Sequence, residues 1–218
     1  MQLGENTITT EVFFKQSETV YKNIEKGRQF ESEKNKLTFD MEIEQMYLVG
    51  DFSVETNGIF TDLPRNAGRY SGGFTICEPK KSITLERLNR QGFPFFSGDI
   101  TVKKTFVANG DDTSLSFNKF GVNVVKAKIN GKEIASFMYE PYYADVSDIV
   151  KNGENEIELT LVNNLRNLLG PFHLAEGESY SVGPGSFYKE NCIWYRGAAD
   201  GRWNDDYCFA DISIFNRK

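Results

Sequence analysis

The segment from Trp194 to Tyr207 brings together side-chain types that bind sugars. It contains two Trp, two Tyr, two Arg and three Asp, interspersed with glycines. Aromatic rings stack on the apolar C–H faces of a sugar, whereas Arg and carboxylate groups hydrogen-bond its hydroxyls. The alternative is that one Trp fills the core and the Arg–Asp pairs only stiffen a loop. We predict a carbohydrate site that includes Trp194, Arg196, Trp203, Asp205 and Tyr207.

A second candidate loop runs from Leu63 to Gly73. It contains three glycines, two arginines and Tyr70. Loops at one end of a β-sandwich are where such folds place binding sites. We therefore add Arg69 to the predicted carbohydrate site, although the loop is also compatible with a solvated excursion that binds nothing.

The acidic pairs of the sequence do not establish hydrolysis. A glycosidase needs two carboxyl groups about 5 to 9.5 Å apart, and one of them needs a raised pKa. Asp111-Asp112 follows Asn109-Gly110 and is typical of a turn, and Glu176 and Glu178 flank a glycine. Asp205-Asp206 is a third pair, but sequence does not place any two carboxyls across a cleft. We expect no catalytic residue in this chain.

Residues that bind metal ions are sparse. His173 is the single histidine, and Cys77, Cys192 and Cys208 lie far apart, which disfavours a zinc site and a metal-dependent cupin enzyme. A structural calcium ion needs six to eight oxygen ligands, often backbone carbonyls, and no D-x-D-x-D-G loop is present. We expect no cofactor and leave the metal ion open.

The charge balance restricts the partners. Lys and Arg number 25 and Asp and Glu number 31, so the net charge is −6. Binders of nucleic acid and of anionic membranes carry a basic surplus, so we expect neither partner and favour carbohydrate. The first residues lack the pattern of a signal peptide, and unpaired cysteines favour a cytoplasmic location, which otherwise stays open.

Alternation of apolar and polar residues predicts half-buried strands along most of the chain. It covers residues 8–14, 100–106, 125–129, 157–161 and 207–215. Asn130-Gly131 predicts a tight hairpin, because both residues of such a turn adopt positive φ. The predicted fold is all-β, an antiparallel β-sandwich.

Helical pattern is confined to two short stretches. Residues Ser82 to Arg90 suit one short helix, and Val146 to Lys151 suit one turn. Asp145 would cap that turn, and Gly153 would follow its end. Neither stretch is long enough for a βαβ unit, which supports the all-β prediction.

Four strings resemble one family of proteins. Over about residues 40 to 215, the chain resembles the sugar-binding accessory modules of bacterial glycoside hydrolases of family 2 type, which have a galactose-binding-domain-like jelly roll. The resemblance implies a module that lies beside a catalytic domain, because a catalytic barrel takes about 250 residues by itself. The strings are Tyr47–Phe52 (YLVGDF), Gln91–Gly98 (QGFPFFSG), Asn130–Glu133 (NGKE) and Val162–His173 (VNNLRNLLGPFH).

The resemblance also suggests a division of the chain. Residues 1–45 are expected to form N-terminal strands that resemble the tail of a preceding similar module, and residues 46–218 the galactose-binding-like sandwich. Gly4-Glu5-Asn6 and Gly153-Glu154-Asn155 repeat one string before a predicted strand, which agrees with this division.

Three functions follow from this interpretation. The first is a non-catalytic carbohydrate-binding accessory module of a bacterial glycoside hydrolase. The alternative is a structural interdomain spacer of the same enzyme, without ligand, which would expose an apolar patch in the isolated chain. A small stand-alone glycoside-active enzyme comes last.

Overall fold

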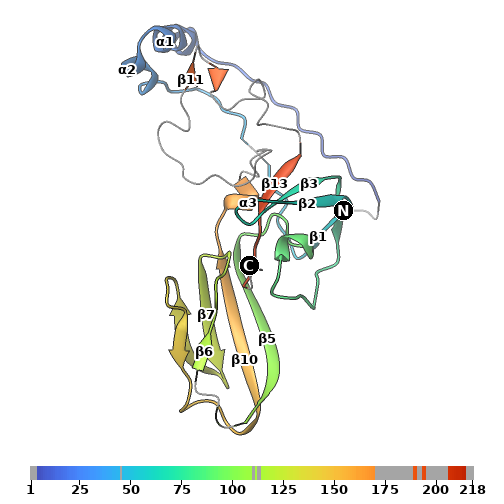
Figure 1. The fold of residues 1–218 in the computed structure, drawn as a ribbon. Helices are drawn as coiled ribbons and strands as arrows, with labels where there is room; N and C mark the ends of the chain where they lie inside the picture. Colours follow the sequence, from blue (N-terminus) through green and yellow to red (C-terminus); the bar gives the residue numbers. More distant parts are fainter. Residues whose placement is uncertain are drawn as a thin grey trace. The chain divides into compact units, whose positions relative to one another are not determined.

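The structure is a computed structural model that describes residues 4–44, 46–109, 111, 114–169 and 206–214, with the backbone of 189–190 and 193–194. Residue contacts divide the chain into two units, Met1–Gly50 and Asp51–Lys218. Figure 1 shows the elements of both. The helices are α1 (Glu18–Gln29), α2 (Glu31–Lys34), the 3₁₀ helix η1 (Leu88–Arg90) and α3 (Arg166–Leu169). The strands are β1 (Ser53–Thr56), β2 (Ile59–Leu63), β3 (Ala67–Ser71), β4 (Phe74–Cys77), β5 (Gly98–Ala108), β6 (Ser114–Ser116), β7 (Val124–Ile129), β8 (Lys132–Phe137), β9 (Tyr143–Asp145), β10 (Gly153–Asn163), β11 (Lys189–Glu190), β12 (Ile193–Trp194) and β13 (Tyr207–Ala210).

The first unit is built around α1, which the sequence analysis did not predict. Its buried face is narrow and consists of Val20 and Gly27 within the helix, while charged residues cover the rest. Glu18 and Lys22 form an i,i+4 ion pair of 3.5 Å on the exposed side. Val20 and Ile24 have helical spacing, but Gly27 completes the buried face without an apolar side chain, so few apolar residues indicate the helix.

The strand predicted over residues 8–14 is absent, since the structure assigns no strand between residues 4 and 44. Ile8 and Phe13 are exposed. The Gln16 side chain instead joins this segment to the returning chain: its Oε1 accepts from the Asp40 amide at 2.8 Å, and its Nε2 donates to the Met41 carbonyl. An alternating pattern gives a segment one apolar and one polar face. It does not provide a neighbouring strand to hydrogen-bond with, and without such a neighbour no sheet forms.

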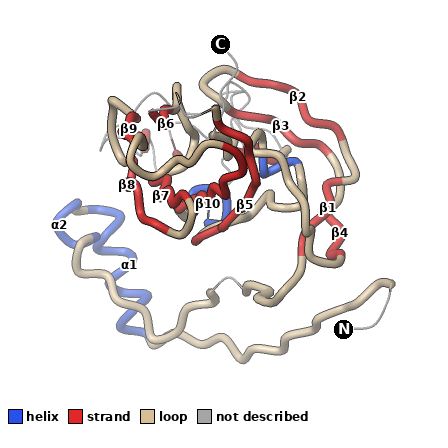
Figure 2. The backbone as a smooth tube through the Cα atoms, turned by 90° about the horizontal axis from the view of Figure 1, so that it is seen from below, coloured by secondary structure: helices blue, strands red, loops and turns tan. Residues whose placement is uncertain are grey.

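The second unit contains a four-stranded antiparallel sheet in the order β5-β10-β7-β8, and Figure 2 shows these strands side by side. β10 is paired along its whole length with β5, from Gly153 opposite Ala108 to Asn163 opposite Gly98. Strands were predicted at 100–106, 125–129 and 157–161, and all three are present. All strand pairings given by the described residues are antiparallel, and the prediction of an all-β sandwich is confirmed.

The hairpin predicted at Asn130-Gly131 joins β7 to β8. Both residues have positive φ, 51° and 77°. Asn130 also serves the neighbouring turn, because its side-chain Oδ1 accepts from the Glu156 amide at 3.1 Å and its Nδ2 donates to Asn155 Oδ1 at 2.8 Å. Asn130 therefore forms the β7–β8 hairpin turn and also hydrogen-bonds the start of β10.

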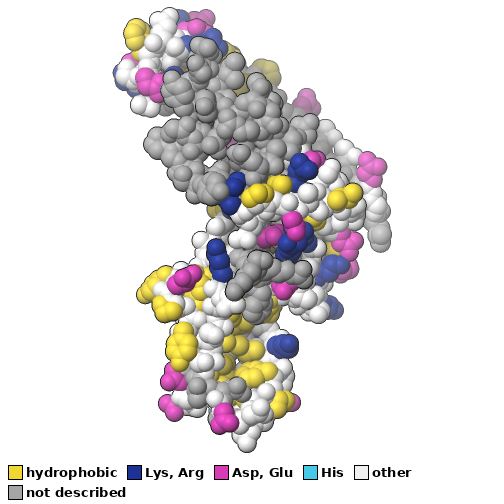
Figure 3. Space-filling model, in the orientation of Figure 1, with side chains coloured by type: hydrophobic (Ala, Val, Ile, Leu, Met, Phe, Trp, Pro, Cys, Tyr) yellow, Lys and Arg dark blue, Asp and Glu magenta, His cyan; other side chains and the backbone are white. Residues whose placement is uncertain are grey.

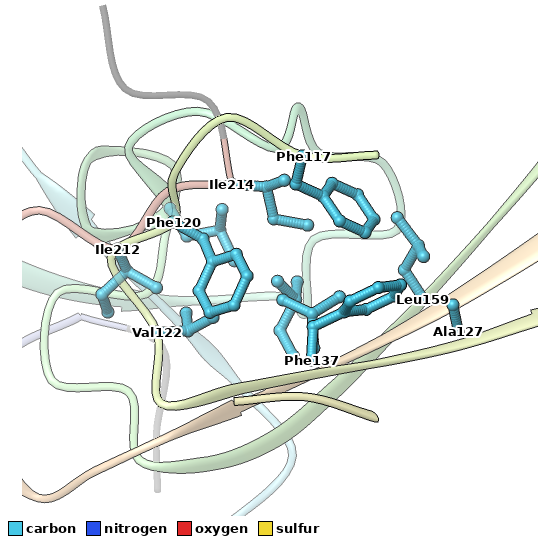
Figure 4. Close-up of a cluster of buried hydrophobic side chains, with 11 residues drawn as sticks. Phe117, Phe120, Val122, Ala127, Phe137, Leu159, Ile212 and Ile214 are labelled. Carbon is cyan, nitrogen blue, oxygen red and sulfur yellow. The ribbon is translucent and has the colours of Figure 1, made fainter. Parts of the chain in front are cut away.

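The core of the second unit lies between the four-stranded sheet and a layer of strand and loop segments. Figure 4 shows Phe117, Phe120 and Phe137 converging with Ile212 and Ile214. Leu115 of β6 and Ala144 of β9 pack against this cluster from the second layer. Cys208, Ile212 and Ile214 of the predicted inward face are buried, but so are Phe209, Asp211 and Ser213 of the other face, so the segment is not half-buried as predicted. β13 itself ends at Ala210.

Residues 211–214 continue beyond β13 and bond to the η1 segment rather than to a strand. The Leu88 amide donates to the Ile212 carbonyl, and the Ile214 amide donates to the Leu85 carbonyl, both at 2.8 Å. The helix predicted over 82–90 is correspondingly reduced to η1, because the preceding backbone groups bond to this late segment.

The predicted turn after Asp145 is present, and Asp145 Oδ1 accepts from the Ser147 amide at 2.9 Å.

Candidate functional site

The predicted carbohydrate residues fall partly outside the described structure. Arg196, Trp203 and Asp205 lie outside the described residues, and of Trp194 only the backbone is described, in β12. His173 and Cys192 also lie outside, whereas Cys77 is half-buried and Cys208 is buried. Tyr207 and Arg69 are described, on the adjacent strands β13 and β3.

Tyr207 belongs to an aromatic cluster. Its ring stacks on Phe209 with centroids 5.7 Å apart and an interplanar angle of 6°. Phe74 and Phe95 meet the same ring edge-on, with centroid distances of 5.1 and 6.2 Å. Because three rings already contact it, packing accounts for the position of Tyr207.

Arg69 lies on the other face of the same sheet. It is opposite Cys208 in the register, whereas Tyr207 is opposite Tyr70, and successive side chains point to opposite faces. Arg69 Nε lies 3.8 Å from Asp206 Oδ2, and both side chains remain about one-third exposed, at 36% and 34%. Arg69 and Asp206 therefore offer a donor and an acceptor at the surface, but Tyr207 is not beside them.

A cluster of two arginines and two aspartates was missed in the sequence. Arg87 donates to both carboxylate oxygens of Asp62, at 3.0 and 2.9 Å, and Arg90 Nη2 donates to Asp62 Oδ1 at 2.7 Å. Both arginines also lie 3.5 Å from the buried Asp211. Hydrogen bonds from Arg87 and Arg90 lower the pKa of Asp62, and the bond to Asp62 raises the pKa of Arg87.

This cluster attaches η1 to the β13-β3-β2 sheet. The Arg90 guanidinium lies 4.6 Å from the centre of the Phe60 ring, over Gly68, whose missing side chain leaves room for it. A Cβ at Gly68 would lie 2.7 Å from Arg90 Nη2. The two positive and two negative charges balance, although the buried Arg90 Nε has no hydrogen-bond partner among the described residues, and the contacts of the cluster account for a structural role. Its members are spread from residue 62 to 211, and no local pattern in the sequence indicates it.

A hollow of about 560 Å³ lies along β5 and is lined by residues 80–83, Phe93 and residues 99–103. Successive β5 residues point to opposite faces of the sheet, so Ile100 and Val102 face the core, whereas Thr101 and Lys103 face the other way, towards Thr160 and Glu158. Ile83, Phe93 and Ile100 are half-buried and also pack against the core, which makes them the apolar floor. The polar lining groups are Lys80, Lys81, Ser82, Asp99, Thr101 and Lys103.

Three further carboxylates of the second unit, Glu55, Asp145 and Glu158, have lowered pKa values. Hydrogen bonds from Lys80 and Lys103 lower the pKa of Glu55 and Glu158 respectively, and bonds from the Ser147 side chain and amide do the same for Asp145. Each of these groups is therefore suited to accept hydrogen bonds rather than to donate a proton.

Within the described ranges, no three His, Cys, Asp or Glu side chains gather as metal ligands would, and no helix is long and apolar enough to cross a membrane.

The fold defines this chain as an antiparallel β-sandwich protein. No protein-family model matches the chain, and no curated protein matches it. The solved structures that match it include glycoside hydrolases.

Three of these structures illustrate the extent of the likeness. A rhamnosidase from Novosphingobium sp. PP1Y is 19% identical with a TM-score of 0.34, over 60% of this chain and 12% of that one. The β-glucuronidase of Lactobacillus rhamnosus is 17% identical with a TM-score of 0.33, over 62% and 25%. The β-D-glucuronidase of Dictyoglomus thermophilum is 15% identical with a TM-score of 0.28, over 64% and 25%. The chain thus spans a quarter or less of these proteins, and likeness at such TM-scores carries no argument about its chemistry.

Proposed function

We propose that this chain is a non-catalytic carbohydrate-binding accessory module, of galactose-binding-like jelly-roll type, that belongs to a glycoside hydrolase. The observation that carries the proposal is the hollow along β5. An apolar floor that includes Phe93 suits the C–H face of a sugar ring, and hydroxyl, carboxylate and ammonium groups around it suit ring hydroxyls. Its volume of about 560 Å³ is in the usual range for small-ligand sites.

The state of the carboxylates supports a non-catalytic role. The acid of a glycosidase needs a raised pKa, so that it carries a proton at neutral pH. Glu55, Asp62, Asp145 and Glu158 all have lowered pKa values, because cations or the Ser147 side chain and amide bond to them. These four groups are built as hydrogen-bond acceptors and not as acids.

The proposal also takes in the late segment that the sequence singled out. Trp194, Arg196, Trp203 and Asp205 are proposed to contribute to glycan binding. The Arg69–Asp206 pair, about one-third exposed, lies near them in sequence through Asp206, which directly precedes β13. We propose no nucleic acid and no membrane as partner. The net charge of −6 is the basis for both.

The test is a glycan-array screen of the full chain, followed by calorimetric titration of each glycan that binds. Ser82→Trp fills the hollow from an exposed position, and Trp203→Ala removes an indole from the late segment. Ser114→Trp, an equally exposed change on β6, is the matched control. Loss of binding in Ser82→Trp or Trp203→Ala but not in Ser114→Trp supports the proposal and assigns the surface. An array without any bound glycan contradicts it.

A second function, that of a structural spacer, is favoured by one surface. Met138, Tyr139 and Tyr143 are large hydrophobic residues close together in the chain, and their exposed fractions are 57%, 78% and 57%. Hydrophobic side chains gather over the part of the molecule that contains β6 to β10 (Figure 3). An exposed patch of this kind is typical of a surface that another domain covers, here the catalytic domain of the parent enzyme.

Light scattering distinguishes the spacer from the binding module. If the patch is a docking surface, the isolated chain should self-associate as its concentration rises, and Tyr139→Glu should abolish that association. A chain that stays monomeric at high concentration and binds a glycan argues for the binding module.

A further inference from the structure

Residues 8–15 of the first unit have the alternation of a strand but no strand beside them. Among the described residues, the backbone of this segment forms no hydrogen bond with other backbone groups. Figure 1 shows the segment as an extended trace that leads into α1. An open strand edge with apolar side chains pairs readily with a strand of another chain, so this segment is a candidate interaction surface.

The returning chain of the first unit contacts one face of this segment through side chains. Thr10 Oγ1 donates to Met46 Sδ at 3.5 Å, and the Gln16 side chain bonds to the backbone of Asp40 and Met41. Even-numbered side chains share one face of an extended chain, so the returning chain lies over that face and not at the backbone edge. An apolar hollow of about 380 Å³ between the two is lined by Phe14, Gln16, Phe39, Met41, Glu42 and Ile43.

The odd-numbered face of the segment points away from the returning chain. Phe13 is 83% exposed, and Glu11 and Lys15 on either side of it are exposed as well. Four residues of extended chain span about 13 Å, so Glu11 and Lys15 are too far apart to form an ion pair within one chain. This face therefore presents an apolar ring between an anion and a cation.

This arrangement is complementary to itself under a two-fold axis. When two copies run antiparallel with Phe13 opposite Phe13, Glu11 of each copy is opposite Lys15 of the other. On the other face, Val12 is then opposite Phe14. Opposite charges and apolar side chains directly across from each other stabilise a strand pair, whereas the register that places Glu11 opposite Glu11 is disfavoured by like charges.

We infer that two copies of this chain form a dimer by antiparallel pairing of residues 10–16 in this register. The inference is independent of the proposed function. The interface is isologous and therefore closes at two copies. A ladder of this length buries less than the roughly 1,200 to 2,000 Å² of a stable interface, so we expect a dissociation constant in roughly the micromolar range or weaker.

The experiment is sedimentation velocity on the full chain over a wide range of concentrations, which should show a reversible monomer–dimer equilibrium. Glu11→Lys and Lys15→Glu should each weaken the dimer roughly 10-fold or more, because two attractive pairs become two repulsive ones. An equimolar mixture of the two variants should dimerise again, since each Lys then meets a Glu. High salt should reduce these differences.

A further variant tests the ring at the two-fold axis. Phe13→Glu should abolish the dimer, because it replaces the contact between two rings by two like charges. Phe30→Glu is the matched control, since Phe30 is a 60% exposed phenylalanine of the same unit outside the segment, and it should leave the dimer unchanged. Both changes are at exposed positions, so folding is preserved, which a melting curve verifies.

The outcomes also separate this dimer from association through the exposed patch around Tyr139. Loss of the dimer in Phe13→Glu but not in Tyr139→Glu supports the inference, and so does recovery in the mixture of charge variants. A chain that stays monomeric at every concentration overturns it. A dimer that persists unchanged in Glu11→Lys and Lys15→Glu, or that only Tyr139→Glu abolishes, overturns it as well.

Discussion

Arg69 and Tyr207 lie on neighbouring hydrogen-bonded strands but on opposite faces of one sheet. Arg69 is opposite Cys208, and Tyr207 is opposite Tyr70. On one face, the Arg69 side chain pairs with Asp206 and is partly exposed. On the other face, the Tyr207 ring packs in an aromatic cluster. A site that uses Arg69 must therefore be built without the Tyr207 ring, and the aromatic cluster is open to a direct stability test.

Phe209→Ala should destabilise the second unit strongly. Phe209 is fully buried and its ring contacts those of Tyr70, Phe74, Phe95 and Tyr207. Removing a buried Phe side chain costs about 3 to 5 kcal/mol, since the lost contacts leave a cavity. Urea unfolding followed by circular dichroism measures the loss. Tyr139→Ala, at an exposed position, should stay within about 0.5 kcal/mol, and equal effects of the two changes would contradict the burial of Phe209.

Asp62→Asn should change how stability depends on pH. Hydrogen bonds from Arg87 and Arg90 lower the pKa of Asp62 in the folded state below the ordinary value of 3.8. The stabilisation is therefore complete above about pH 4 and is lost as the pH falls through the folded-state pKa.

Urea midpoints measured between neutral pH and about pH 2 test this dependence. The difference between wild type and Asp62→Asn should be largest at neutral pH and should shrink in acid. Asp99→Asn, which removes an exposed carboxylate on the β5 hollow, is the control. A difference that grows as the pH falls has the wrong sign for the cluster described above.

Asn155→Ala should destabilise the turn that precedes β10. The buried Asn155 side chain accepts from the Lys151 amide at 2.9 Å and donates to the Lys151 and Gly153 carbonyls at 2.7 and 2.9 Å. Each of these three hydrogen bonds contributes about 0.5 to 1.5 kcal/mol, so we expect a loss of about 2 to 4 kcal/mol.

Hydrogen exchange of the Lys151 amide provides a second readout, because this amide should lose its protection in Asn155→Ala. Asn152→Ala removes an exposed amide side chain from the same turn and should leave both stability and exchange unchanged. Retained protection at Lys151 in Asn155→Ala would show that the side chain does not hold the turn.

Gly58→Ala should be destabilising by overpacking. A Cβ at Gly58 would lie 2.0 Å from the Ser71 carbonyl oxygen, which belongs to the backbone and cannot turn aside. Forced overlap of this kind costs about 1 to 3 kcal/mol or more. Gly73→Ala, which places its Cβ in open space, is the control and should be nearly neutral in a thermal melt. Melting temperatures that fall equally would mean that loss of glycine flexibility, and not contact, is responsible.

Local pattern was a good guide to the four-stranded sheet. The alternation at 100–106, 125–129 and 157–161 and the Asn130-Gly131 pair each predicted an element that is present. These signals are local: period-two burial and the positive φ of a turn act on residues that are adjacent in the chain. The same signal misled at residues 8–14, because a strand also needs a partner and these residues lack one.

The sequence by itself determined the all-β class, the hairpin and the capped turn after Asp145. Tertiary structure decided which side chains meet. The register of β13 against β3 places Arg69 and Tyr207 on opposite faces of the sheet. The fold also brings Asp62 and Asp211, about 150 residues apart in the chain, to the same arginine, Arg87. The physical reason is that strand faces and tight turns depend on residues adjacent in the chain. A binding site depends on strand order and register, which only the packing of the core selects.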